Sequence, residues 1–123
     1  MLHEPGSRTL EFAAMSGEGS DSLIGVRIAD TTGVAGWVLS AREPMFLDDV
    51  ASNRLFAEEI AETIGYIPKR LAAMPLLLED RALGVLEILD GLASARFTTA
   101  HVDLLGDLAD EAARAVAGGA RER

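Results

Sequence analysis

The stretch "LAAMPLLLEDRALGVLEIL", residues 71–89, decides how this chain is expected to fold. It contains two apolar runs, residues 72–78 and 82–89, which are separated by a polar turn around Asp80 and Arg81. Apolar runs of this length, bounded by turn residues, are typical of strands that are covered on both faces. We therefore expect a pair of adjacent strands within a sheet that carries other elements on both of its faces.

One charge interrupts this pattern, because Glu87 lies in the middle of the second strand. A buried carboxylate costs free energy unless it finds a partner. Two interpretations remain open. Glu87 is either a polar anchor inside a ligand pocket, or a sheet residue that is paired to a basic side chain or exposed at an open part of the face.

The residues before this hairpin predict two strands and a short helix. Alternation in "RTLEFAAM", residues 8–15, indicates a half-buried strand. The segment "DTTGVAGWVLSA", residues 30–41, can form a short helix, and "MFLDDV", residues 45–50, reads as a short strand. Gly33 and Gly36 lower the helix propensity of the first segment, so we expect another backbone or side chain to approach closely there.

Two further helices follow from periodicity and capping residues. In "ASNRLFAEEIAETIG", residues 51–65, Ser52 or Asn53 can cap the start and Gly65 the end. The last helix is expected to begin at Thr98 and to end at Gly118. It carries a heptad-like seam of five apolar residues. These are Val102, Leu105, Ala109, Ala112 and Val116. Strands interspersed with helices in this order predict an α+β fold.

Composition limits the function. The 123 residues suit a single domain, and 49% of them are hydrophobic, so a core can form. A net charge of -9 argues against nucleic acid and against anionic membrane surfaces as partners. No apolar run approaches the roughly 18 residues of a membrane span, and no secretory signal is recognisable. The absence of cysteine fits a cytoplasmic protein.

The sequence offers no recognisable catalytic motif, so we expect no enzyme activity. His3 and His101 belong to no metal motif, and no serine lies in a nucleophile-elbow pattern. Asp48 and Asp49 are neighbours at a strand end, where alternating side chains point to opposite faces rather than converging.

Aromatic and apolar residues instead suggest one wall of a ligand cavity. Most of the aromatic residues cluster between residues 37 and 66, and Trp37 among them is the best candidate for a purely structural role. The candidate ligand-binding residues are Phe46, Phe56, Ile60, Tyr66, Met74, Leu76 and Glu87.

Three ordered segments resemble the GAF domain family. They are "TGVAGWVLSAREPMFLDDVASNRLF", "GYIPKRLAAMPLLLEDRALGVLEILD" and "RFTTAHVDLL". The resemblance covers residues 8–117. It implies a GAF-like (profilin-like) central antiparallel sheet with helices on both faces and a cavity on one of them. It also implies regulatory binding of an unidentified small molecule and signalling through the terminal helices of a dimer.

The resemblance also argues against three groups of cofactors. Members that bind cyclic nucleotides carry an Asn-Lys…Phe…Asp-Glu signature, of which only Phe97 remains here. Covalent bilin attachment, like the methionine-sulfoxide-reducing activity of this fold, requires a cysteine. Haem would need a histidine in the pocket, and neither histidine is well placed.

Family members usually begin with a helix that pairs with the closing helix, and that helix is missing here. Either residues 1–123 are one GAF-like domain of a larger signalling protein, or the helix is absent. We expect the last helix to form a homodimer through its seam. The alternative function is a ligand-free scaffold that serves dimerisation or partner docking.

Overall fold

The computed structural model describes residues 1–14, 23–90 and 97–122. Its centre is a six-stranded antiparallel sheet with the strand order β3-β2-β1-β6-β5-β4. The strands are β1 (Leu2–Glu4), β2 (Thr9–Glu11), β3 (Arg27–Ala29), β4 (Met45–Leu47), β5 (Leu71–Leu78) and β6 (Arg81–Leu89). This sheet confirms the predicted α+β fold.

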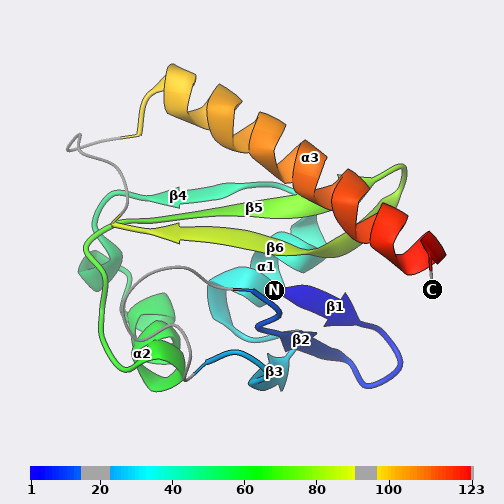
Figure 1. The fold of residues 1–123 in the computed structure, drawn as a ribbon. Coiled ribbons are helices and arrows are strands. Elements are labelled where there is room, and N and C mark those ends of the chain that lie inside the picture. Colours follow the sequence, from blue (N-terminus) through cyan, green and yellow to red (C-terminus); the bar gives the residue numbers. More distant parts are fainter. Residues whose placement is uncertain (15–22, 91–96, 123) are drawn as a thin grey trace.

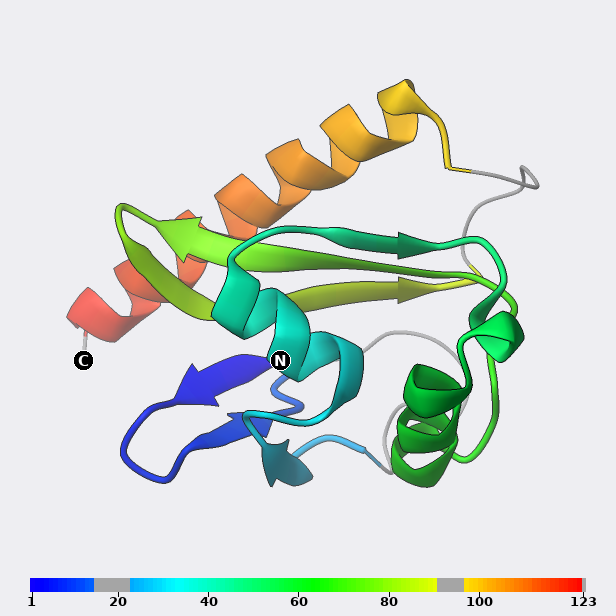
Figure 2. The same cartoon turned by 180° about the vertical axis from the view of Figure 1, so that it is seen from behind.

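Three α-helices cover the sheet. They are α1 (Gly33–Ala41), α2 (Arg54–Ile64) and α3 (Thr99–Glu122), and a short 3-10 helix spans Val50–Ser52. Helix α3 runs along one face (Figure 1), whereas α1 and α2 lie on the opposite side, as the view from behind shows (Figure 2). We call these the α3 face and the α1/α2 face.

Strands β5 and β6 form the predicted hairpin and supply both cores. Because successive strand residues point to opposite faces, Leu71 and Ala73 pack under α1 and α2, whereas Ala72 and Met74 pack under α3. Both faces of this hairpin are therefore covered by helices, which explains its almost continuous apolar sequence.

Helix α1 lies against the turn that precedes it. A Cβ atom added at Gly36 would lie 2.5 Å from the backbone carbonyl carbon of Thr31, closer than non-bonded atoms approach. The expected close approach at this glycine is confirmed, because only glycine leaves room for the turn between β3 and α1 to fold back on the helix.

Helix α2 begins and ends as its capping residues predict. The Asn53 side chain accepts a hydrogen bond from the Phe56 backbone N–H at 3.4 Å. Gly65 then adopts the left-handed conformation, with φ of 88°, and its N–H donates to the Ala61 carbonyl. These contacts satisfy backbone groups that the helix itself leaves unpaired.

Helix α3 confirms one prediction and corrects another. Thr98 caps its start: the Thr98 hydroxyl accepts from the His101 N–H at 3.3 Å, and His101 Nδ1 accepts from the Thr98 N–H at 3.1 Å. The expected end at Gly118 is wrong, because the helix continues to Glu122. Glycine weakens a helix but keeps its N–H donor, so it does not stop the hydrogen-bond ladder as proline does.

The start of the chain also differs from the expectation. Residues 2–4 form strand β1, which lies between β2 and β6 in the sheet and was not predicted from the sequence. Gly84 on β6 makes the approach possible, since a Cβ atom there would lie 2.1 Å from the Met1 carbonyl oxygen.

Candidate functional site

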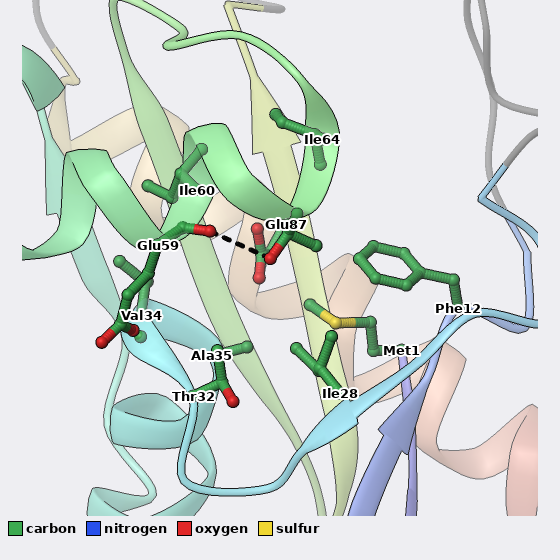
Figure 3. A pocket seen from close by; sticks show the side chains of 12 residues that line it. Met1, Phe12, Ile28, Thr32, Val34, Ala35, Glu59, Ile60, Ile64 and Glu87 are labelled. Atoms are coloured by element: carbon green, nitrogen blue, oxygen red, sulfur yellow. Dashed lines mark hydrogen bonds between the residues drawn. The ribbon is translucent and has the colours of Figure 1, made fainter.

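The α1/α2 face contains a small cavity between the sheet and the two short helices (Figure 3). Its volume is about 30 Å³. Strand β6 forms its floor, α2 covers it, and α1 and the N-terminal strands close its sides. The lining residues are Met1, Phe12, Ile28, Thr32, Gly33, Val34, Ala35, Glu59, Ile60, Thr63, Ile64 and Glu87.

Glu87 is the polar residue on the cavity floor. It lies opposite Ala73 in the β5–β6 ladder, so its side chain leaves the sheet on the α1/α2 face. Figure 3 shows the carboxylate rising beneath α2, with Ile60 and Ile64 above it. In the part of the chain that the structure describes, no hydrogen bond reaches this carboxylate.

The environment of Glu87 disfavours its charged form. Burial raises the pKa of this carboxyl from 4.5 to about 7, and the nearby Met1 ammonium opposes that shift only in part. The Met1 ammonium donates to the Val85 carbonyl at 2.7 Å, and burial lowers its own pKa. Near neutral pH, Glu87 is therefore divided between its protonated and ionised forms.

A second carboxylate enters the cavity from the opposite side. The Glu59 side chain descends from α2 toward the first turn of α1 (Figure 3). A Cβ atom at Gly33 would lie 2.6 Å from Glu59 Oε2, so this glycine makes room for the carboxylate. Among the described residues, Oε2 is buried without a hydrogen-bond partner. The dashed line in Figure 3 marks a hydrogen bond that the Thr63 hydroxyl donates to the backbone carbonyl of Glu59 at 2.9 Å.

Comparison with protein families shows to which family this chain belongs. The sequence model of the GAF domain matches residues 5–116. This chain belongs to the GAF domain family. The comparison with curated proteins gives no match.

Solved GAF domains share the fold at low sequence identity. The GAF domain of a phosphoenolpyruvate-protein phosphotransferase from Coxiella burnetii is 18% identical, with a TM-score of 0.84 over 98% of this chain and 71% of that one. The corresponding Acinetobacter domain is also 18% identical, with a TM-score of 0.80 over 98% and 70%. A free methionine-R-sulfoxide reductase from Neisseria meningitidis, solved with its substrate, is 26% identical, with a TM-score of 0.69 over 94% and 66%.

The GAF fold does not bring the seven predicted ligand-binding residues together. Ile60 and Glu87 line the cavity, and Phe56 packs into the core on the same face. Tyr66 follows α2 and is 52% exposed. The other three, Phe46, Met74 and Leu76, belong to the core of the α3 face.

Phe46 shows why one cavity could not include all seven. It pairs with Ala72 in the sheet, and both residues point toward α3. Its ring packs against that of Phe97, with centroids 5.2 Å apart and planes tilted by 59°. The protein's own side chain therefore fills the space beside Phe46.

Several cavity residues were absent from the sequence prediction. Met1, Phe12 and Ile28 come from the N-terminal strands, which fold back toward α2. The alternation that placed Phe12 on the buried side of a strand was the available signal. It could not show that Phe12 would line the same cavity as residues of α2, because no local pattern encodes that arrangement.

A wider surface groove of about 720 Å³ opens where β1 diverges from the β5–β6 turn. His3 Nε2 and Asp30 Oδ2 lie 3.0 Å apart at its wall. Arginine and aspartate side chains both line it, since Arg42 and Arg81 are accompanied by Asp30 and Asp80. This mixture favours no single class of ligand. None of the described helices has both the length and the apolar composition that crossing a bilayer requires.

Proposed function

We propose that this GAF domain is a regulatory module that binds a small organic molecule in the cavity of the α1/α2 face. The observation that carries the proposal is Glu87, a carboxylate that accepts no hydrogen bond from the described residues and lies in an otherwise largely apolar cavity. Maintaining such a group costs free energy in the empty protein. A ligand that supplies the missing partner offsets this cost, as expected for a binding site.

Binding requires the cavity to enlarge. Its volume of about 30 Å³ is sufficient for water but not for an organic ligand, which typically occupies a site of roughly 300–1,000 Å³. Helix α2 is the element that has to move, because Glu59, Ile60, Thr63 and Ile64 form the cover. The ligand would then select an open arrangement over the closed one described here.

We place the dimer contact on the outer side of α3. Leu105 and Ala109 of the predicted seam are each only 2% exposed, because they pack against the sheet of their own chain. Leu104 and Leu108, one position before them, are 55% and 46% exposed. We propose that a second copy of the chain packs at these two leucines and that ligand binding changes this contact.

The proposed role is regulatory and not enzymatic. The reductase resemblance implies a cysteine-based reaction, and the chain contains no cysteine. A cytoplasmic location remains part of the proposal. The small volume of the cavity favours a second candidate function, a ligand-free GAF scaffold for dimerisation or docking.

A thermal-shift screen of a broad metabolite library, with native mass spectrometry of the protein from its own host, tests ligand binding. A ligand present at 100 times its Kd stabilises the fold by about 2.7 kcal/mol. Ala35→Leu should abolish the shift, because Ala35 lines the cavity. Ala41→Leu, at the exposed end of the same α1 helix and outside the cavity lining, is the control. The scaffold function is supported if no compound shifts the wild type and none co-purifies.

Sedimentation velocity tests the dimer contact separately. Leu104→Glu combined with Leu108→Glu should convert the dimer into a monomer, because a charge at each position would be buried without a partner. Asp107→Lys, an exposed charge change on the same helix, is the control for a purely electrostatic effect. A wild-type monomer at high micromolar concentration contradicts the proposal.

A further inference from the structure

We propose that the ligand of this cavity is a small organic cation, an amine or amidine with a short apolar body, whose charged group is held by Glu87. This inference rests on the proposed ligand-binding function and assigns its chemical class. Cavity geometry and the charges of the lining residues support it.

The sign of the lining charges is the first argument. Glu59 and Glu87 are the charged side chains of the cavity, and its described lining contains no lysine, arginine or histidine. A phosphate, carboxylate or nitrate ligand would bring a like charge toward two carboxylates in a region of low dielectric constant, which is strongly unfavourable. A cation is attracted to both carboxylates, and the Met1 ammonium near Glu87 is the one positive group of the described lining that opposes it.

The position of Glu87 is the second argument. Its carboxylate stands below Ile60 and Ile64, and Phe12 lies to its other side (Figure 3). A nitrogen that bears several N–H groups can donate to such a carboxylate in short, charge-assisted hydrogen bonds. The isoleucine and phenylalanine side chains then provide an apolar surface for a hydrocarbon body.

The alternative positive occupants fit less well. Among the described residues, no three histidine, aspartate or glutamate side chains converge as a metal site. The Met1 ammonium is close to Glu87 and donates to the Val85 carbonyl at 2.7 Å, but it makes no hydrogen bond to the Glu87 carboxylate. Glu59 Oε2, at the α1 end of the cavity, is a buried acceptor that has no partner among the described residues.

Titration of Glu87 gives the proposal a pH signature. The charged groups that face this carboxylate are the Met1 ammonium, which precedes β1, and Glu59 from α2. With the pKa of Glu87 raised to about 7, the ionised form that a cation requires becomes dominant only above neutral pH. The affinity of an amine should therefore fall about tenfold from pH 8 to pH 6.

An isosteric series tests the charge of the ligand directly. The probes are 3-methylbutan-1-amine, 3-methylbutan-1-ol and 3-methylbutanoate, titrated into the protein and followed by amide chemical shifts of the α2 and β6 residues. At pH 8 the amine should bind at least about tenfold more tightly than the alcohol, which corresponds to one charge-assisted contact. The acid should cause no shift.

Variants assign the preference to Glu87. Glu87→Gln keeps the shape of the side chain and should reduce the amine-to-alcohol ratio to within about threefold, with the pH dependence lost. Glu62→Gln removes a charge from the exposed side of the same α2 helix and should leave both properties unchanged. Preserved amide spectra show that each variant is folded.

Two results would overturn the cation class. One is an alcohol or acid that binds as tightly as the amine, and the other is no amine binding at millimolar concentration. In either case the proposed function survives if the metabolite screen finds a ligand of another charge that Ala35→Leu excludes. A screen without any ligand rejects the proposed function itself.

Discussion

The two faces of the sheet are built from the same strands and differ in what covers them. On the α3 face, one helix of 24 residues lays Leu105, Ala109 and Ala113 on an apolar surface. On the α1/α2 face, helices of 9 and 11 residues leave a cavity with a carboxylate on its floor. The α3 face therefore mainly stabilises the domain, whereas the α1/α2 face retains a carboxylate whose burial costs free energy.

The difference in helix length has a physical consequence. A single long helix presents a continuous stripe that fills the sheet surface at regular spacing. Two short helices meet above the sheet, and the junction between them lies beside Gly33 and Glu59. Polar side chains and unfilled volume are concentrated at this junction.

The largest expected effect is on the α3 face. Leu105→Ala removes a side chain that is 2% exposed and should lower the free energy of unfolding by about 2–5 kcal/mol. Urea denaturation measures the change, with Leu55→Ala on α2, at a position 65% exposed and outside the proposed dimer contact, as the matched control. An equal loss in the two variants would show that α3 does not pack as described.

A smaller loss is expected where α1 meets its preceding turn. Gly36→Ala places a Cβ atom against the Thr31 backbone and should destabilise the domain by about 1–3 kcal/mol, despite the better helix propensity of alanine. Gly118→Ala near the end of α3 meets no atoms within 4 Å and should be neutral or stabilising. Thermal denaturation compares the pair. A stabilised Gly36→Ala variant would contradict the close approach.

The next effect is a pH dependence of stability that arises from Glu87 on the α1/α2 face. Glu87 binds its proton more tightly in the folded than in the unfolded protein, so stability should fall as pH rises from 4.5 through about 7 and then level off. Below pH 4.5, both states are protonated and the residue contributes nothing. Because water reaches the cavity and screens the charge, we expect Glu87→Gln to gain about 1–2 kcal/mol at pH 8 and less at pH 5.

Urea denaturation of both proteins at several pH values measures this change. Glu62→Gln, at an exposed position, should follow the wild-type pH profile. A Glu87→Gln variant whose stability retains the wild-type slope between pH 5 and pH 8 would rule out Glu87 as the titrating group.

The smallest effect concerns the aromatic pair on the α3 face. Phe46→Leu should cost about 1 kcal/mol, because it removes the ring contact with Phe97 and retains an apolar side chain. It should leave amine binding unchanged, since Phe46 does not line the cavity. A changed amine affinity in this variant, measured by the same amide titration, would show that packing on the α3 face affects the cavity on the other face.

Local patterns predicted most of the elements. The hairpin of β5 and β6, the cap at Asn53 and the left-handed Gly65 all follow from short segments, since each depends on neighbouring residues. Strand β1 was missed because three residues form too short a pattern, and its place depends on pairing with Gly84. That residues 1–123 are one GAF-like domain, either alone or within a larger signalling protein, remains a prediction.

The candidate site was predictable only in part. Glu87 stood out because a charge inside an apolar strand is unusual, and Ile60 lay on the buried stripe of its helix. Alternation in β5 separated Met74 from Ala73, but it could not show which set would lie under α3. That assignment depends on contacts between segments far apart in the sequence.

The alternation of β6 has one further consequence for communication within the domain. Glu87 points into the cavity, whereas its neighbours Leu86 and Ile88 pack in the core beneath α3. One peptide unit in either direction therefore separates the ligand-binding residue from side chains that pack beneath the helix that we propose for dimer contact. A shift of the β6 backbone at Glu87 would displace side chains on both faces of the sheet at once, without the involvement of intermediate residues.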